Sequence, residues 1–381
     1  MSNKDSPASD PPGALPSRYA LVAALTFTCV MLAGLWQMIA VTRNPGQLEF
    51  PSTWLDFREG RTTGTLEKQL DHKLPARATI IATANSLRYL LTRGGGDQVR
   101  VGSDGWLFLT DELKFDADGN AHLAARASLF DSASRGLDSQ GVKLMIALVP
   151  DKARLYAGKL SRGQYPAYNL PRYTDALAEL RKRNVAVVDL LTPLAAGAAR
   201  GPVYYSSDTH WNQVGAQIAA EVVALDVQKL GVELEKTTFV TTATGSKAER
   251  PGDLIRLMGL ANTPDILRPR SDVEVPVLTK QTSADTSTGL FGDASVPVAL
   301  TGTSYSLRGN FHGFLQQALS AKVLNTAKDG GGLLQAPTAY LMDEAFKSSK
   351  PKILVWEVPE RFLYSKLDDE PKWLKKVGLP P

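Results

Sequence analysis

Residue types that mark several common functional sites are scarce in this sequence. A single cysteine, Cys29, excludes an intramolecular disulfide and a cysteine-based zinc site. Only four histidines are present, and none stands in the His-Glu-x-x-His pattern of many zinc hydrolases. The net charge is only +4 and no run of lysine and arginine forms a basic patch, which argues against a nucleic-acid partner. We expect neither a metal nor a cofactor.

Charge is also absent from one long N-terminal segment. Residues 19–42 contain no charged side chain and are rich in Leu, Val, Ala and Met, and about 20 apolar residues are enough to span a bilayer as a helix. A cleaved signal peptide would have a shorter apolar region and a clearer cleavage site. We therefore predict a disordered tail at residues 1–17, an uncleaved transmembrane anchor at 18–42 and a linker at 43–62. The flanking charges leave the orientation undecided.

Apolar strands and amphipathic helices alternate in the remainder, residues 63–381. The strands are expected at 142–150, 185–190, 296–301 and 352–358, after a hairpin at 99–109. The helices are expected at 65–92, 124–140, 170–183, 211–230, 310–322 and 338–347. This alternation predicts an α/β fold with a mainly parallel sheet and helices on both faces. Residues 231–295 break the rhythm and are interpreted as an insertion beside the functional site.

Two short peptides, Asp208-Thr-His210-Trp-Asn212 and Gly302-Thr-Ser304-Tyr-Ser306, carry the chemical information. A serine needs an adjacent base to be nucleophilic at neutral pH, and the base needs a third group to fix its tautomer. We predict this relay for Ser304, His210 and Asp208. Asp208 would alternatively be a helix N-cap and Ser304 a turn serine. Ser306 competes as nucleophile but lacks a glycine two positions before it.

Acyl transfer also needs hydrogen-bond donors for the developing oxyanion. The backbone N–H near Ser304 is one candidate, and Asn310 is the best side-chain candidate, although an N-cap role is equally plausible for it. Tyr305 and Arg361 are further candidates for contacts to the oxyanion or the substrate. His312 lacks a paired carboxylate, so we assign it to packing.

Other polar motifs are weaker. Residues 116–120 have only part of a calcium-loop pattern and are interpreted as a turn. The glycines at 330–332 are not followed by the Gly-Lys-Ser/Thr of a phosphate loop. Lys152 and Arg154 follow a predicted strand, where they would contact substrate or simply solvate a loop.

Taken together, these motifs resemble the AlgJ/AlgX family of SGNH-like polysaccharide O-acetyltransferases over residues 56–363. The matching segments are 101–108, 149–154, 208–212, 302–306, 310–311 and 356–361. In that family the Asp-x-His pair precedes the serine, a permuted order relative to other SGNH enzymes, as it does here. The resemblance implies that Ser304 is the nucleophile, His210 the base and Asp208 its orienter.

The resemblance also implies a biological setting. Family members act in the bacterial periplasm on an exopolysaccharide such as alginate, and a related protein acts on cellulose. A membrane-bound O-acyltransferase of the inner membrane supplies the acetyl group, so the domain after the anchor is expected to be periplasmic. AlgX carries a C-terminal carbohydrate-binding module that this chain is expected to lack. The alternatives are a polysaccharide acetylesterase or deacetylase on the same triad, and a non-catalytic polymer-binding scaffold of a synthase complex.

Overall fold

The computed structural model describes residues 17–43, 53–62, 64–65, 77–161, 165–282, 296–366 and 370–380. Contacts divide the chain into two units, Met1–Ala84 and Asn85–Pro381, each described by itself. The predicted tail, apart from residue 17, and residues 44–52 of the predicted linker lie outside the described residues.

The smaller unit contains helices α1 (Ser17–Thr42) and α2 (Trp54–Arg58), and α4 (Arg77–Thr92) crosses the boundary between the units. The segment predicted as an anchor is therefore helical. Within the part of the chain that the structure describes, however, no helix combines the length and the apolar character needed to cross a membrane. The predicted transmembrane anchor at 18–42 is not supported.

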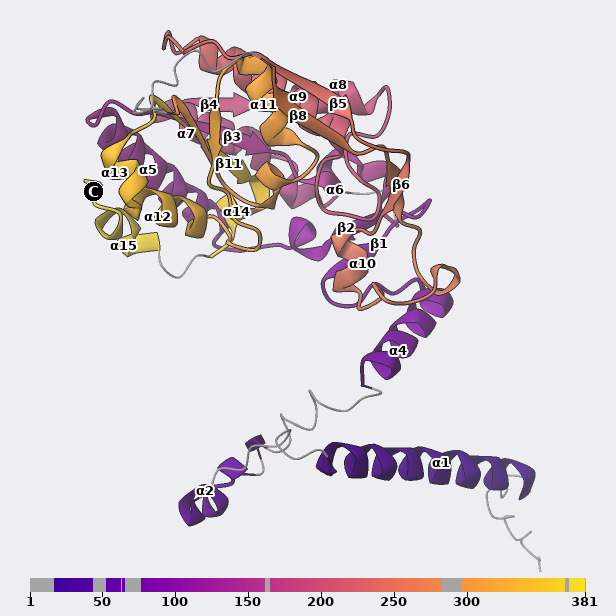
Figure 1. Cartoon of the computed structure of the whole chain (residues 1–381). Coiled ribbons are helices and arrows are strands. Elements are labelled where there is room, and N and C mark those ends of the chain that lie inside the picture. The colour runs from indigo at the N-terminus through magenta and orange to yellow at the C-terminus, as the bar shows by residue number, and fades with distance from the viewer. Residues whose placement is uncertain are drawn as a thin grey trace, which may run out of the picture. The chain divides into compact units, whose positions relative to one another are not determined.

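A five-stranded parallel sheet forms the centre of the larger unit, which confirms the predicted α/β fold (Figure 1). The strand order is β10-β9-β11-β3-β4. The strands are β3 (Lys143–Val149), β4 (Val187–Asp189), β9 (Val298–Thr301), β10 (Val323–Asn325) and β11 (Ile353–Pro359). β3 and β11 pair in parallel along their whole lengths, from Ile353 opposite Lys143 to Pro359 opposite Val149. Their carboxyl ends therefore reach the same edge of the sheet, where ligands of such folds usually bind.

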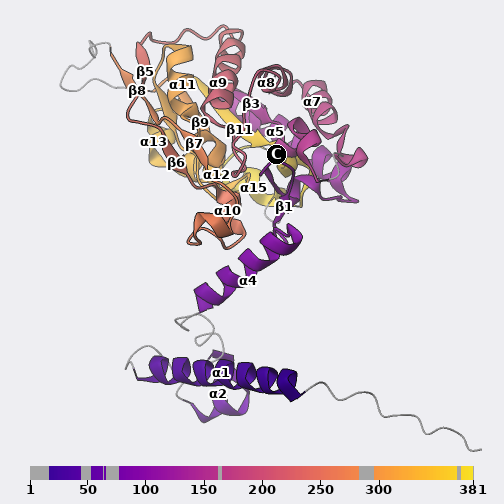
Figure 2. The ribbon, with the colours of Figure 1, turned by 90° about the vertical axis from the view of Figure 1, so that its right-hand side faces the viewer.

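Helices cover both faces of the sheet, as predicted (Figures 1 and 2). Side chains alternate along a strand, so Met145 and Ala147 of β3 enter one core while Leu144 and Ile146 enter the other. The first core is closed by α8 (Leu191–Ala198), α9 (Gln213–Gln228) and α11 (Phe311–Leu319). The second is closed by α5 (Gly119–Asp138), α7 (Arg172–Lys182), α12 (Gln335–Met342), α13 (Glu344–Ser348), α14 (Glu360–Tyr364) and α15 (Glu370–Lys376).

Three local predictions were wrong for physical reasons. The helix predicted from 211 begins at Gln213, because the side chain of Asn212 caps it by accepting from the Gly215 N–H at 3.0 Å. The helix predicted at 338–347 is split at Asp343, whose extended backbone and side-chain bond to Ala345 start a new helix. The edge strand β10 was missed, because three residues are too few to show a pattern.

The described part of the predicted insertion forms two small antiparallel sheets and a short helix. β5 (Phe239–Ala243) pairs with β8 (Val277–Gln281), and β6 (Ala248–Arg250) pairs with β7 (Asp272–Glu274). The helix is α10 (Asp253–Leu257). The predicted hairpin at 99–109 is present as β1 (Val99–Val101) and β2 (Leu107–Leu109).

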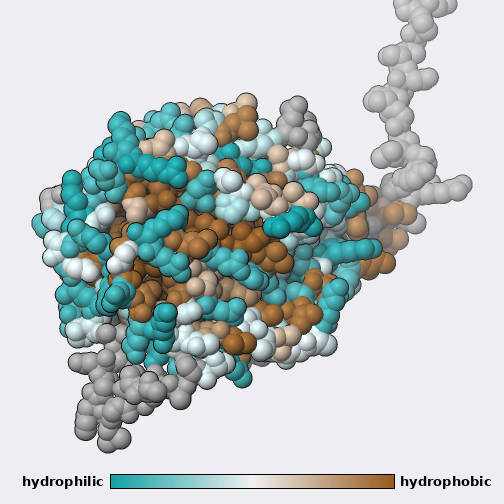
Figure 3. Space-filling model, turned by 90° about the horizontal axis from the view of Figure 1, so that it is seen from above, coloured by the Kyte–Doolittle hydropathy of each residue, from teal (hydrophilic) through white to brown (hydrophobic). Residues whose placement is uncertain are grey.

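The surface over the first core is not uniformly polar. Seen from above the view of Figure 1, apolar side chains gather toward the middle of the face between polar ones (Figure 3). Helix α9 leaves Val214 and Leu225 more than half exposed, so it is apolar on more than its core-facing side. Helix α9 therefore carries more apolar residues than packing against the core requires.

Candidate active site

The sequence brings the functional side chains to the carboxyl edge of the sheet on two loops. Ser304 begins a short 3₁₀ turn immediately after β9. Asp208 and His210 lie in the loop before α9, which is closed by an isolated antiparallel bridge between Tyr204 and Trp211. Because the bridge fixes both ends of this loop, the residues between them have little freedom.

Asp208, His210 and Ser304 form a continuous chain of hydrogen bonds. The Nε2 atom of His210 lies 2.6 Å from the Ser304 hydroxyl oxygen, and its Nδ1 atom lies 2.5 Å from Oδ1 of Asp208. The same Oδ1 accepts from the His210 backbone N–H at 2.9 Å. The side chains of Asp208 and His210 are buried. The structure thus brings the predicted nucleophile, base and orienter together, and the alternative N-cap role of Asp208 is wrong because Asn212 caps α9.

A buried glutamate at the end of β11 fixes the turn that carries Ser304. The Glu357 carboxylate accepts from the backbone N–H of Thr303 at 2.7 Å and from the hydroxyls of Thr303 and Ser306. Gly302 has φ +146°, and a Cβ there would lie 2.7 Å from the Glu357 carbonyl oxygen. Glycine is therefore required for the turn to approach β11. Ser306 is buried and bonded away from His210, which removes it as a competing nucleophile.

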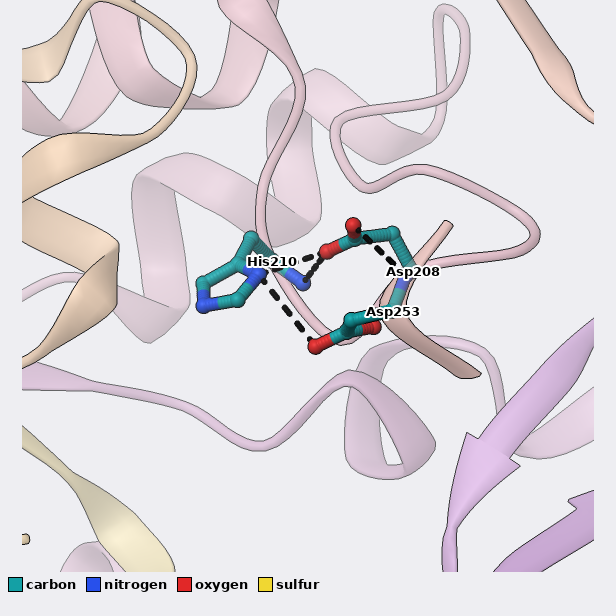
Figure 4. Close-up of side chains that lie close together, drawn as sticks. All are labelled: Asp208, His210 and Asp253. Carbon is teal, nitrogen blue, oxygen red and sulfur yellow. Dashed lines mark hydrogen bonds and ion pairs between the residues drawn. The ribbon is translucent and has the colours of Figure 1, made fainter. Parts of the chain in front are cut away.

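The insertion supplies two residues that hold Asp208 from its other side. Oδ2 of Asp208 accepts from the Arg250 guanidinium at 3.1 Å and from the backbone N–H of Asp253 at 3.1 Å. The Asp253 carboxylate accepts from the N–H and hydroxyl of Thr209 and lies 3.7 Å from Nδ1 of His210 (Figure 4). Both residues were missed, because they lie more than 40 positions from Asp208 and belong to no motif.

These contacts determine the charge of Asp208. Burial on its own would raise the pKa of this carboxyl, but the hydrogen bonds from His210 and the positive charge of Arg250 outweigh burial and hold its pKa well below the usual range. Asp208 is therefore ionised and accepts the Nδ1 proton, which leaves Nε2 to face Ser304 as an acceptor. Asp208, His210 and Asp253 are also a potential metal-ligand group by composition and spacing, but hydrogen bonds account for their arrangement.

The lowered pKa of Asp208 predicts a pH dependence of stability. A carboxyl with a depressed folded-state pKa stabilises the fold above its unfolded pKa of about 4 and loses that contribution as pH falls through the folded value. We expect the unfolding free energy of the wild type to fall toward that of Asp208→Asn as the pH drops below about 4. Urea titrations of both proteins from pH 6 to pH 3 measure this; a constant gap would contradict it.

Lys152 is not exposed and does not line the cavity in front of Ser304, contrary to both predicted roles. Its side chain is fully buried, and Nζ donates to the carbonyls of Leu107 at 2.6 Å, Ser206 at 2.9 Å and Asp208 at 2.9 Å. Burial lowers the pKa of this ammonium to about 8, against the opposing charges of nearby carboxylates, Glu112 first among them. Arg154 is similarly engaged, with the Glu360 carboxylate and the backbone carbonyls of residues 169 and 170. Both residues are structural supports beneath the site.

The remaining predicted residues have different positions. The Tyr305 hydroxyl donates to the Thr209 carbonyl at 2.7 Å, and its ring packs edge-on against His210 with centroids 4.8 Å apart. Arg361 lines the cavity in front of Ser304. Asn310 does not line it, and its amide donates to Thr279 of β8 at 2.9 Å without capping α11. His312 bonds to the Val323 carbonyl at 2.7 Å, in keeping with a packing role.

A cavity of about 630 Å³ opens in front of Ser304 and His210, within the size range of sites for small molecules. Among the residues that the structure describes, its lining includes the arginines Arg250, Arg256, Arg308 and Arg361. Arg250 is paired with Asp208, Arg308 with Asp329 at 2.7 Å and Arg361 with Asp151 at 3.4 Å. Arg256 is exposed and, within the described residues, has no charged partner. The site therefore presents a nucleophile beside cationic side chains.

Comparisons with known proteins agree with this geometry. Residues 99–360 match the family described as SGNH hydrolase-like domain, acetyltransferase AlgX. The probable alginate O-acetylase AlgJ of Pseudomonas aeruginosa is 34% identical over 91% of this chain and 90% of its own length. The solved O-acetyltransferase domain of Pseudomonas putida AlgJ is 34% identical, with a TM-score of 0.65 over 74% of this chain and 99% of that domain. AlgX of Pseudomonas aeruginosa, 25% identical, has a TM-score of 0.56 over 74% of this chain and 67% of that one. The chain therefore belongs to the AlgX family of SGNH hydrolase-like acetyltransferase domains, and it is an O-acetyltransferase.

Proposed function

We propose that this protein transfers acetyl groups to hydroxyls of a bacterial exopolysaccharide through an acetyl-Ser304 intermediate. The observation that carries the proposal is the unbroken hydrogen-bond chain from Asp208 through His210 to Ser304. Alginate is the favoured acceptor, because the relatives named above are probable alginate O-acetylases. Cellulose is the second candidate acceptor.

In the first half-reaction Ser304 Oγ attacks the carbonyl carbon of the donor's acetyl group. His210 Nε2 takes the serine proton and returns it to the leaving group as the carbon–oxygen or carbon–sulfur bond to the donor breaks. In the second half-reaction His210 takes the proton of a sugar hydroxyl, whose oxygen attacks the acetyl-serine. The bond between Ser304 Oγ and the acetyl carbon then breaks, and His210 returns the proton to Ser304 Oγ. Asp208 remains ionised throughout and stabilises the imidazolium.

The oxyanion that forms in both steps needs donors pointing into the cavity. The backbone N–H of Ser304, at the start of its 3₁₀ turn, is the donor we propose. Arg361 lines the same cavity and adds positive charge near the developing oxyanion. Asn310 is a weaker candidate in this arrangement, because its amide is engaged with Thr279 outside the cavity lining.

One arginine of the cavity, Arg256, favours an acidic acceptor over a neutral one, since the other three are paired with carboxylates. A guanidinium binds a carboxylate through two parallel hydrogen bonds, a geometry that a neutral hydroxyl does not match. Arg256 is free to do this among the described residues. Alginate is a polymer of uronic acids and carries one carboxylate per sugar, whereas cellulose carries none. These features support alginate.

The donor and location are parts of the same proposal. A membrane-bound O-acyltransferase of the inner membrane would bring acetyl groups across, and the catalytic domain would meet them and the polymer in the periplasm. Water competes with the sugar for the acetyl-serine, so the same residues would also support esterase activity.

Covalent labelling tests the proposal directly. A small activated acetyl ester should place an acetyl group on the peptide containing Ser304, detectable by mass spectrometry. The label should be absent in Ser304→Ala and still present in Ser306→Ala, a matched control on the same turn. Absence of label in the wild type would favour the scaffold. Hydrolysis that exceeds transfer to a uronic-acid polymer under saturating acceptor would favour the esterase.

A further inference from the structure

A second cavity, also of about 630 Å³, lies outside the catalytic one in the larger unit. The end of α4, the turn between β1 and β2, and residues 265–271 of the insertion form its walls. Tyr89 lies in the wall as a buried aromatic residue, and Ile266 stands on the rim with 83% of its surface exposed. Nothing in the triad chemistry uses these residues.

The charges of this cavity do not cancel. Asp104 is paired with Lys159 at 2.6 Å, and Asp265 is paired with Arg268. Arg93 and Arg270 remain. Arg93 donates to the Tyr89 hydroxyl at 3.2 Å and lies over its ring, but has no carboxylate partner among the described residues. Arg270 is exposed and likewise unpaired within that set. The cavity thus offers two guanidinium groups to an anionic ligand.

The backbone of Arg93 is a second, independent observation. Arg93 follows the last residue of α4 with φ +54°, in the left-handed region. Glycine usually takes this position after a helix, and other residues cost free energy there. Three glycines follow at 94–96, so the chain places arginine in the strained position although glycines stand next to it. Strain of this kind at a cavity wall points to a functional side chain.

The same segments of the chain line both cavities, with different residues in each. Ser206 lines the second cavity and Asp208 the catalytic one, and a chain segment of two residues spans at most about 7 Å. The β1–β2 hairpin contributes its turn residues to the second cavity and Leu109 to the catalytic one. The insertion contributes Arg256 to one and Arg270 to the other. A ligand too long for the catalytic cavity would therefore reach the second cavity by passing over these segments.

We infer that the second cavity is a binding subsite for a carboxylate-bearing segment of the acceptor polymer, next to the segment being acetylated. The inference rests on the proposed function. Arg93 and Arg270 bind carboxylates of the chain, and Tyr89 holds the Arg93 guanidinium in place through its ring and hydroxyl. The subsite takes no part in the chemistry. It increases the affinity for acceptors long enough to occupy both cavities, because the second contact is intramolecular once the first has formed.

Acceptor length gives the test. With the full chain, KM for transfer to defined β-1,4-linked oligomers of uronic acid should fall between a trimer and a decamer. In Arg93→Gln/Arg270→Gln the ratio of trimer KM to decamer KM should shrink about three- to tenfold, the range for two exposed guanidinium–carboxylate pairs. Arg181→Gln/Lys182→Gln, at the end of α7 away from this edge of the sheet, removes the same charge and should keep the wild-type ratio. An unchanged ratio in Arg93→Gln/Arg270→Gln would overturn the inference.

A rim substitution makes the test independent of any folding defect. Ile266 is exposed, so Ile266→Asp and Ile266→Lys should both fold, yet they should move the decamer KM in opposite directions, upward and downward respectively. Equal shifts, or none, would contradict the subsite. Acetyl-Ser304 labelling by the small ester distinguishes failure of the proposed function from failure of the subsite. Its loss in the wild type would reject the proposed function, whereas normal labelling without length dependence would reject the subsite alone.

Discussion

Replacing His210 with asparagine is expected to lower the rate of acetyl transfer by about five to six orders of magnitude, as removal of the base does in other serine triads. His210 is the only group of the described site within hydrogen-bonding distance of the Ser304 hydroxyl that can accept its proton. Without it the serine is a weak nucleophile at neutral pH. Release of the leaving group from a small acetyl ester, followed under saturating enzyme, measures the loss.

The contrast between histidines provides the control. His312 is also bonded through Nε2, but to the Val323 carbonyl and outside the catalytic cavity. His312→Asn should change stability by about 1 kcal/mol and leave the rate within a few-fold of wild type. Comparable rates for His210→Asn and the wild type would mean that another base, or none, serves Ser304.

Asp208→Asn should produce a smaller loss, by about four orders of magnitude, because an amide orients the wrong tautomer of the imidazole. The Asp253 N–H and Arg250, which also pairs with Glu274 at 3.3 Å, would remain as donors without the Asp208 carboxylate. An asparagine can turn its oxygen toward them, but its NH₂ then faces Nδ1 of His210. Nδ1 would then have to accept a hydrogen bond, so the imidazole proton would sit on Nε2. In this tautomer Nε2 cannot accept the serine proton.

The functional residues that could be predicted from the sequence are those that form a recognisable motif with residues close to them in the chain. Asp208 and His210 are two positions apart, and Ser304 follows a buried strand through a glycine that the approach to Glu357 requires. Such local patterns are visible without a fold. The helices and central strands were predictable for the same reason, since their apolar periodicity is local.

The residues that escaped prediction act over long distances in the sequence. Arg250 and Asp253 reach Asp208 only because β6 pairs with β7 and sets the insertion against the catalytic loop. Asn310 shows the reverse error, because its position at a helix start looked favourable while β8 occupies its amide. Tertiary packing determines these roles, and the spacing of residues in the sequence does not predict it.

Lys152→Met is expected to destabilise the larger unit by about 3–5 kcal/mol and lower the melting temperature by about 10 °C. Lys152 uses its three N–H groups on the carbonyls of Leu107, Ser206 and Asp208, so one side chain joins the β1–β2 hairpin to the catalytic loop. Methionine fills a similar volume but leaves the buried carbonyls of Leu107 and Asp208 without this donor, whereas the Ser206 carbonyl still accepts from the Leu107 N–H at 2.9 Å. A buried charge paired with another charge is often replaceable by an apolar residue. Here the partners are backbone carbonyls that no substitution removes, so the cost remains.

Thermal and urea unfolding of Lys152→Met measure this cost, with Lys347→Met as the matched control. Lys347 pairs with Glu344 at 2.7 Å, but both side chains are exposed, and such pairs contribute only about 0–1 kcal/mol. Transfer activity should fall in Lys152→Met even below its melting temperature, because the Asp208 carbonyl loses its Lys152 donor. A loss below about 1 kcal/mol would mean that water or the hairpin itself satisfies these carbonyls.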